Sequence, residues 1–304
     1  MVSEIQLRLA VIIYDILCSA SYVLVIHLRP TRALPHQPID RNNPLTIKER
    51  CQRASVLTAT HVLLLPILLK VLRLSEIAET TAKLGIVVGY HNQSWSFSNL
   101  QDDIVSIFKA LGLTMILFSG PIVDYFYYSN STEVIKQDLA YVVSLEGMRD
   151  LLVGPITEEL LYRSCSISLM LVANDYANKF LFGQHWLIMV SSLYFGIAHL
   201  HHAVELYHCK RYSLTTITIS TAFQWSYTTL FGIYASFLYL RTGSVWSAIV
   251  VHSFCNMMGF PRLTFGRDEA RDWKVGYYVL LALGSVLFKK FLYSLTESNH
   301  TLLL

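Results

Sequence analysis

The stretch that decides the fold is Gly-Pro-Ile-Thr-Glu-Glu-Leu-Leu-Tyr-Arg, residues 154–163, where two adjacent glutamates stand in an apolar segment. Leu-Leu-Val precedes it at residues 151–153, so Glu158 and Glu159 have apolar neighbours on both sides. A carboxylate at the centre of a membrane helix costs about 2.5–3.5 kcal/mol. Two of them in one segment predict an active site inside the membrane.

The composition is that of a membrane protein. Hydrophobic residues make up 53% and charged residues 15% of the 304 residues, and the mean hydropathy is +0.43, whereas soluble domains carry about 25% charged residues. The formal net charge is only +3, and no basic block alternates with aromatic residues, which excludes a nucleic-acid-binding protein. Five scattered cysteines without C-x-x-C spacing predict neither a disulfide framework nor a thiolate zinc site.

Apolar segments long enough to cross a bilayer, about 20 residues each, recur from residues 5–28 to residues 275–292. Because unpaired backbone groups cannot face lipid, they predict an all-α fold. We expect a polytopic membrane bundle of seven or eight transmembrane helices around an intramembrane catalytic cavity, depending on the short segment 77–90. No repeat or change of composition marks a second domain, so residues 1–304 are predicted to be one domain with its catalytic motifs within 154–260.

The connection at residues 29–53 is basic. It holds six arginine or lysine residues against Asp40 and Glu49. By the positive-inside rule this segment is predicted to be cytosolic.

The two glutamates are expected to have different roles. On a helix, Glu159 and Arg163 stand at i and i+4 and can form an ion pair, whereas Glu158 lies about 100° round the axis. We therefore predict a supporting ion pair of Glu159 with Arg163. A carboxylate without a countercharge in a low dielectric suits a general base acting on water, and Glu158 is the predicted base. Thr157 or Gly154-Pro155 is expected to begin or break the helix here and to leave free N–H groups near the carboxylates.

A second group of polar residues is Phe-Gly-Ile-Ala-His-Leu-His-His, residues 195–202, at the end of an apolar segment. His199 is the candidate to orient a water molecule against a glutamate. His201 and His202 are interpreted as interfacial residues.

The third group is Val-His-Ser-Phe-Cys-Asn, residues 251–256. His252 and Asn256 at i and i+4 present hydrogen-bond donors on one side of a helix, as an oxyanion hole requires. The alternative is a polar clasp between helices. Because three apolar segments each bring polar groups, we expect these groups to meet in one water-filled cavity.

In this order, the motifs Glu158-Glu159-x-x-x-Arg163, Phe195-x-x-x-His199 and His252-x-x-x-Asn256 resemble those of the type II CAAX prenyl endopeptidases. These are the Ras-converting enzymes of the wider ABI family, and the similarity is greatest to fungal and other eukaryotic members. Other phrases, such as Asn256-Met257-Met258-Gly259-Phe260-Pro261, extend the resemblance over most of the chain.

The resemblance implies a multi-pass enzyme of the endoplasmic-reticulum membrane. It implies partners that are prenylated CAAX proteins, of the Ras or a-factor type with a farnesyl or geranylgeranyl cysteine, from which the last three residues are removed. Carried over by position, Glu158 activates water, His199 holds and polarises it, and His252 with Asn256 stabilises the oxyanion. Glu159 and Arg163 support the site, and no cofactor is expected.

Three alternatives stay open at this point. His199, His252 and Glu158 could form a two-histidine, one-carboxylate zinc site that also activates water, although no H-E-x-x-H motif is present. A non-catalytic membrane protein could use the same cavity to bind a lipidated tail. A cysteine protease would use Cys255 with His252, but residues three apart on one helix rarely reach attacking geometry.

Overall fold

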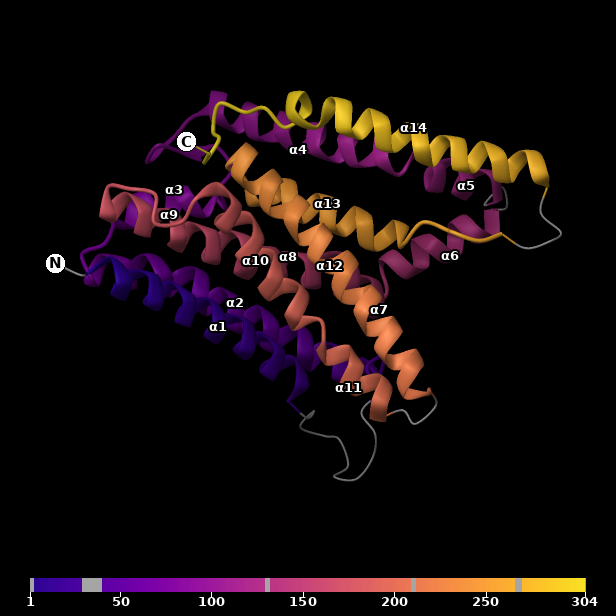
Figure 1. Cartoon of the computed structure of the whole chain (residues 1–304), viewed down its shortest axis with the longest axis horizontal. Coiled ribbons are helices and arrows are strands. Elements are labelled where there is room, and N and C mark those ends of the chain that lie inside the picture. The colour runs from indigo at the N-terminus through magenta and orange to yellow at the C-terminus, as the bar shows by residue number, and fades with distance from the viewer. Residues whose placement is uncertain (1–2, 29–39, 129–131, 209–211, 266–269, 304) are drawn as a thin grey trace.

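The computed structural model describes residues 3–28, 40–128, 132–208, 212–265 and 270–303. These form an elongated bundle of helices, as the all-α prediction requires (Figure 1). The described residues also contain a short hairpin whose two strands have two residues each. The hairpin pairs β1 (Tyr90–His91) antiparallel to β2 (Ser94–Trp95). The basic segment predicted to be cytosolic lies partly outside the described residues, because only its portion from residue 40 onward is described.

The first half of the chain builds one flank and one face of the bundle. Helices α1 (Glu4–His27) and α2 (Pro44–Val71) lie side by side, while α4 (Phe97–Leu117) packs along α14 (Arg271–Leu295) on the other flank (Figure 1). The same half of the chain also forms four short helices, which are α3 (Ile77–Leu84), α5 (Ser119–Tyr128), α6 (Thr132–Val142) and α7 (Leu145–Met148).

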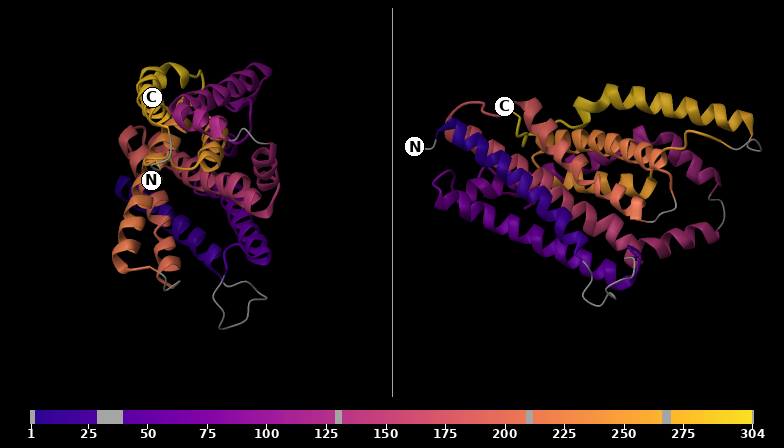
Figure 2. Two further views of the ribbon diagram at one scale, coloured as in Figure 1. Left: turned by 90° about the vertical axis from the view of Figure 1, so that its right-hand side faces the viewer. Right: turned by 60° about the horizontal axis from the view of Figure 1, so that its bottom comes forward.

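The centre of the bundle is made by the later helices. They are α8 (Gly154–Glu159), α9 (Ser166–Ala177), α10 (Gln184–Ala198), α11 (His201–His208), α12 (Leu214–Thr242) and α13 (Val245–Met258). Helix α12 crosses α10 and packs on α13, and the turned views of Figure 2 also place α13 between α12 and the α4–α14 flank. Segments far apart in the sequence therefore meet around α8.

Fewer helices are long and apolar enough to cross a membrane than the seven or eight expected. Within the described ranges, four qualify, namely Glu4–His27, Pro44–Val71, Gln184–Val204 and Arg271–Leu295. A fifth arises if Phe97–Leu117 and Ser119–Tyr127, which meet at a 72° bend, are counted as one span. Helix α12 is long enough at 29 residues but carries many serines and threonines, and α13 is short.

The glutamate-bearing segment is one continuous helical path with two wide turns, in which the regular α-helix α8 begins at Gly154 with Pro155 in its first turn. A π-helical turn η1 (Arg149–Val153) precedes α8, and a second, η2 (Leu160–Cys165), joins α8 to α9. Pro155 lacks an amide N–H and cannot complete the regular ladder with the turn before it. The wide turn η1 accommodates the proline, so an α-helix begins at Gly154 as predicted, while the helical path itself does not break. Wide turns of this kind are frequent at functional sites.

Candidate active site

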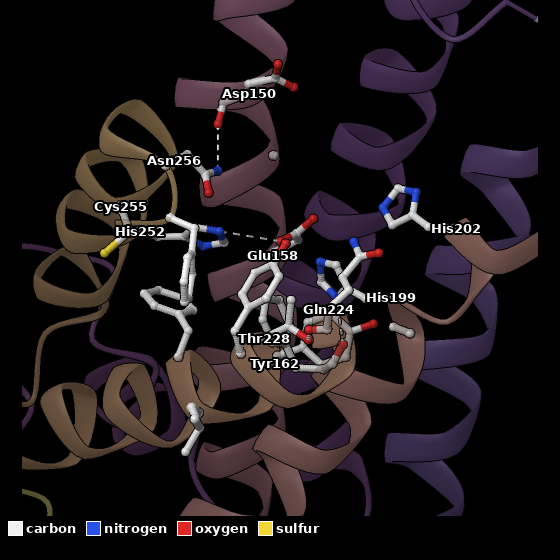
Figure 3. Close-up of a pocket in the computed structure, with 18 of the residues that line it drawn as sticks. Asp150, Glu158, Tyr162, His199, His202, Gln224, Thr228, His252, Cys255 and Asn256 are labelled. Carbon is white, nitrogen blue, oxygen red and sulfur yellow. Dashed lines mark hydrogen bonds and ion pairs between the residues drawn. The ribbon is translucent and has the colours of Figure 1, made fainter. Parts of the chain in front are cut away.

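A cavity of about 1050 Å³ lies in the middle of the bundle. Its wall is contributed by α1, α2, α4, α6, η1, α8, η2, α10, α11, α12, α13 and α14. Glu158, His199, His252 and Asn256 all line it (Figure 3). The structure therefore brings together the four residues that the sequence singles out as candidates for catalysis.

Glu159 lies behind the cavity wall in a buried ionic network. Its Oε1 accepts hydrogen bonds from Nη1 of Arg163 at 3.1 Å and from Nδ1 of His252 at 2.7 Å. Neither Glu159 nor Arg163 has any exposed side-chain surface. The predicted ion pair is present, and the additional contact with His252 ties α13 to α8.

The Arg163 guanidinium is enclosed by aromatic rings and by a close helix. It lies 4.3 Å from the centroid of the Phe195 ring and 6.0 Å from that of Phe231, so the rings shield its charge from lipid. A Cβ on Gly232 of α12 would come within 3.0 Å of Nη2 of Arg163. The glycine therefore gives α12 room to pass over the guanidinium.

Glu158 faces the cavity, with 19% of its side chain exposed. Its Oε2 lies 3.8 Å from Nε2 of His252. This distance exceeds a direct hydrogen bond but leaves room for a bridging water. His252 thus stands between the two glutamates, an arrangement that the sequence did not predict.

His199 is the C-cap residue of α10, at the cavity wall. Its Nδ1 donates to the carbonyl oxygen of Phe195 at 2.8 Å, and the ring rests edge-on against Phe195. Because Nδ1 is the donor, Nε2 of the neutral ring is an acceptor. His201 and His202 also line the cavity, so their surroundings are not limited to the membrane interface.

Asn256 lies one turn beyond His252 on α13. Its Nδ2 donates to the main-chain oxygen of Asp150 at 2.8 Å (Figure 3). An amide carries two N–H groups, so one donor of Asn256 is used here and one is left for the cavity. The contact with η1 also gives Asn256 part of the clasp role that the sequence left as an alternative.

Other lining residues carried no recognisable sequence signal. Tyr22 of α1 lines the cavity, and its hydroxyl lies 2.9 Å from Oγ1 of Thr157. Thr157 donates its own proton to the carbonyl oxygen of Val153, so Tyr22 is the donor in this pair. A lone tyrosine in an apolar helix reads as packing, and only the tertiary structure places it next to Glu158.

Cys255 lines the cavity but does not form a nucleophile pair with His252. Its sulfur points away from the His252 ring in Figure 3, and the side chain packs against the apolar cluster of Ala110, Leu238 and Val251. The geometry therefore disfavours the cysteine-protease alternative.

Within the described ranges, no three histidine, cysteine, aspartate or glutamate side chains are grouped so that they could hold one metal ion. In the zinc alternative His252 would bind through Nε2, because its Nδ1 is bonded to Glu159.

Comparison with known proteins gives a consistent set of relatives. The sequence model of the family described as "Type II CAAX prenyl endopeptidase Rce1-like" matches residues 142–258, which include all six candidate residues. CAAX prenyl protease 2 of Saccharomyces cerevisiae is 31% identical over 307 residues, covering 90% of the chain and 93% of the relative. CAAX prenyl protease 2 of Homo sapiens is 34% identical over 195 residues, covering 61% of the chain and 56% of the relative.

A further relative, from Schizosaccharomyces pombe and named probable CAAX prenyl protease 2, is 28% identical over 274 residues, covering 89% of the chain and 88% of the relative. No solved structure matches the chain.

Proposed function

The chain belongs to the family of type II CAAX prenyl endopeptidases, and on this premise we propose that it cleaves with a water molecule activated by Glu158. It is a membrane protease of CAAX processing that removes the C-terminal tripeptide of prenylated proteins. The observation that carries the glutamate mechanism is that Glu158, His199, His252 and Asn256 line one cavity.

Glu158 is the general base in this proposal. It is the carboxylate of the pair that reaches the cavity, while Glu159 is held by Arg163 and His252. A water held between Glu158 and the acceptor Nε2 of His199 attacks the carbonyl carbon of the prenylcysteine. Its proton passes to the Glu158 carboxylate as the bond to carbon forms.

His252 and Asn256 stabilise the oxygen that becomes negative. Asn256 has one N–H engaged with Asp150 and one left, whereas His252 has Nδ1 engaged with Glu159 and offers a donor at Nε2 only as the imidazolium. These contacts fix both side chains in place before the reaction. A protonated His252 would also balance the charge of the group, because Glu158 and Glu159 carry two negative charges against one on Arg163. Both Nδ1 and Nε2 are donors in that state.

The tetrahedral intermediate then collapses. The bond from carbon to the amide nitrogen breaks, and Glu158 returns its proton to that nitrogen. The products are a protein that ends in a prenylcysteine carboxylate and a free tripeptide.

The apolar part of the cavity suits an isoprenoid. Side chains of Phe118, Phe231, Tyr234, Leu281 and Phe288 line it. An isoprenoid gains free energy from burial there in proportion to its apolar area. We propose farnesyl- or geranylgeranyl-cysteine proteins as the substrates. We also propose that the protein lies in the endoplasmic-reticulum membrane, and imaging of a fluorescent fusion protein tests this location.

The decisive experiment separates cleavage from binding. Purified wild-type protein and Glu158→Ala are incubated with a farnesylated peptide, and release of the tripeptide is measured together with binding of the peptide. We expect the variant to bind and not to cleave. Cleavage by Glu158→Ala at the wild-type rate would refute the glutamate mechanism, and a wild-type protein that binds without cleaving would favour the lipid-tail binder.

We also propose that catalysis needs no metal. Among the described residues, no three histidine, cysteine, aspartate or glutamate side chains are grouped so that they could hold one metal ion. Treatment of the purified protein with a strong chelator should leave the rate unchanged. Complete loss of activity that added zinc restores would overturn this part of the proposal.

A further inference from the structure

The wall of the cavity differs in charge from one region to another. Residues from α4, α12 and α14 are mainly apolar or aromatic. The turn before α2 contributes Arg41, α2 contributes Arg50 and the turn η1 contributes Arg149. Among the described residues that line the cavity, the carboxylates are Asp150 and Glu158. The wall formed by α2 and η1 therefore carries an excess of positive charge.

One of these arginines is already neutralised. Nε and Nη2 of Arg149 bond to the two carboxylate oxygens of Asp150 at 2.6 and 3.0 Å, and the Tyr141 hydroxyl bonds to Oδ2 at 2.9 Å. Burial alone would raise the pKa of Asp150, but these hydrogen bonds hold it below its ordinary value. Asp150 therefore stays ionised and compensates Arg149.

Arg41 is placed differently. Nη1 of Arg149 donates to the main-chain oxygen of Arg41 and to Oδ1 of Asn42, both at 3.1 Å, which holds this part of the chain beside the start of η1. The Arg41 guanidinium itself makes no hydrogen bond or ion pair with another described residue, and it is exposed at the cavity wall. The main chain of Arg41 is therefore held in place, and its guanidinium is available to bind an anion.

The spacing between this position and Glu158 matches a tripeptide. Asp150 and Glu158 are eight residues apart on one helical path. An α-helical rise of 1.5 Å per residue would separate them by about 12 Å along the axis, and the wider turn η1 makes this an upper figure. Three extended residues span about 10–11 Å. A peptide whose scissile carbonyl is at Glu158 can therefore bring its terminal carboxylate to Arg41.

Resting on the proposed function, we propose that Arg41 binds the free α-carboxylate at the C-terminus of the substrate. The Arg149–Asp150 pair positions Arg41. A carboxylate makes charge-assisted hydrogen bonds with a guanidinium that an amide does not. The arginine thus selects a chain end three residues beyond the prenylcysteine over an internal peptide segment.

The test uses two farnesylated peptides that differ only at the last residue, which ends in a carboxylate in one and a carboxamide in the other. In neutral detergent, we expect wild-type protein to cleave the acid with a kcat/KM about 10- to 100-fold higher, mainly through KM. In Arg41→Gln the ratio should fall towards one because cleavage of the acid slows. An extra residue, which moves the carboxylate by about 3.5 Å, should also slow the wild-type enzyme.

Arg53→Gln is the matched control. Arg53 lies on α2, the helix that follows Arg41, but bonds to Glu49 and to the main-chain oxygen of Leu28, and it does not line the cavity. It should keep the wild-type ratio. Equal cleavage of acid and amide by the wild-type protein would overturn the anchor and leave the protease function intact, whereas no cleavage of either peptide would refute the function itself.

A lipid phosphate offers the same chemistry as a carboxylate. Reconstitution of the wild-type protein and Arg41→Gln into neutral and anionic bilayers, with cleavage of the acid and the amide measured in each, distinguishes the two sources. If anionic lipid changes the activity of the wild-type protein but not that of Arg41→Gln, while the acid-to-amide ratio of the variant stays at the wild-type value, Arg41 is a headgroup contact and the proposal is wrong.

Discussion

The molecule contains two buried pairs of a histidine and a carboxylate that are almost alike in geometry. Nδ1 of His252 lies 2.7 Å from Glu159, and Nε2 of His91 lies 2.9 Å from Asp103. Both histidines are 6% exposed. Their surroundings differ, because Nε2 of His252 faces Glu158 across the cavity wall, whereas the ring of His91 is stacked on His300 with centroids 3.7 Å apart.

The difference teaches that a buried histidine–carboxylate pair does not by itself make a site. The pair at His91 holds structure, since Asp103 also accepts from the amide of Gly89 at 2.7 Å. The stacked His300 belongs to a segment that bonds to the end of α12, where the amide of Leu302 donates to the oxygen of Leu240. A site needs the second carboxylate and the space for substrate that only the His252 pair has.

The largest expected effect is on His252. In His252→Gln the amide can still donate to Glu159, but no imidazole faces Glu158 or the developing oxyanion. We expect kcat to fall by about 10²- to 10⁴-fold, measured as tripeptide release under single-turnover conditions.

His91→Gln is the matched control for this substitution and should retain kcat in the folded fraction. Equal losses in the two variants would break the comparison between the pairs.

The next effect concerns the buried charge on Arg163. Glu159→Gln leaves this guanidinium without a carboxylate in contact, and removal of one partner of a buried ion pair costs on the order of 3–5 kcal/mol. Thermal unfolding in detergent should show a clear loss of stability.

The double variant Glu159→Gln with Arg163→Met removes both charges and should recover most of that stability without recovering activity. A double variant as active as the wild type would mean that Glu159 does not orient His252.

The sequence predicted those parts of the site that depend on local geometry. The ion pair of Glu159 with Arg163 follows from a spacing of four residues on one helix, and the structure contains it. The all-α architecture follows from apolar segments whose backbone must be satisfied internally. The substrate class came from family resemblance, because apolar composition alone does not identify an isoprenoid.

The remaining parts depend on contacts between distant segments. His252 and Glu159 are 93 residues apart, and Asn256 and Asp150 are 106 apart. Helical periodicity gives the face on which each residue lies but not the rotation of one helix against another. The π turns were missed for a related reason, since a proline inside a helical pattern fits a break and a wide turn equally well.

A smaller effect is expected at Asn256, where two roles can be separated. Asn256→Ala should lower kcat by about 10²-fold with little change in KM if the free N–H meets the oxyanion. Asn256→Asp keeps the shape but has no donor, so it should lose activity to a similar degree.

If stability falls in Asn256→Ala while kcat per folded molecule stays near the wild-type value, the side chain only fastens α13 to Asp150. In that case the role of Asn256 would be structural, like that of the His91–Asp103 pair.

The smallest effect on catalysis is expected for the pair without a cavity. Asp103→Asn weakens the bonds to His91 and Gly89, so a loss of about 1–3 kcal/mol in stability is expected, together with faster proteolysis of the segment at residues 296–303. The kcat of the folded protein should stay at the wild-type value, because no group of this pair lines the active-site cavity. A loss of kcat without a loss of stability would show that the His91–Asp103 pair is coupled to the His252–Glu159 pair. The path for such coupling is α4 and α13, which pack together.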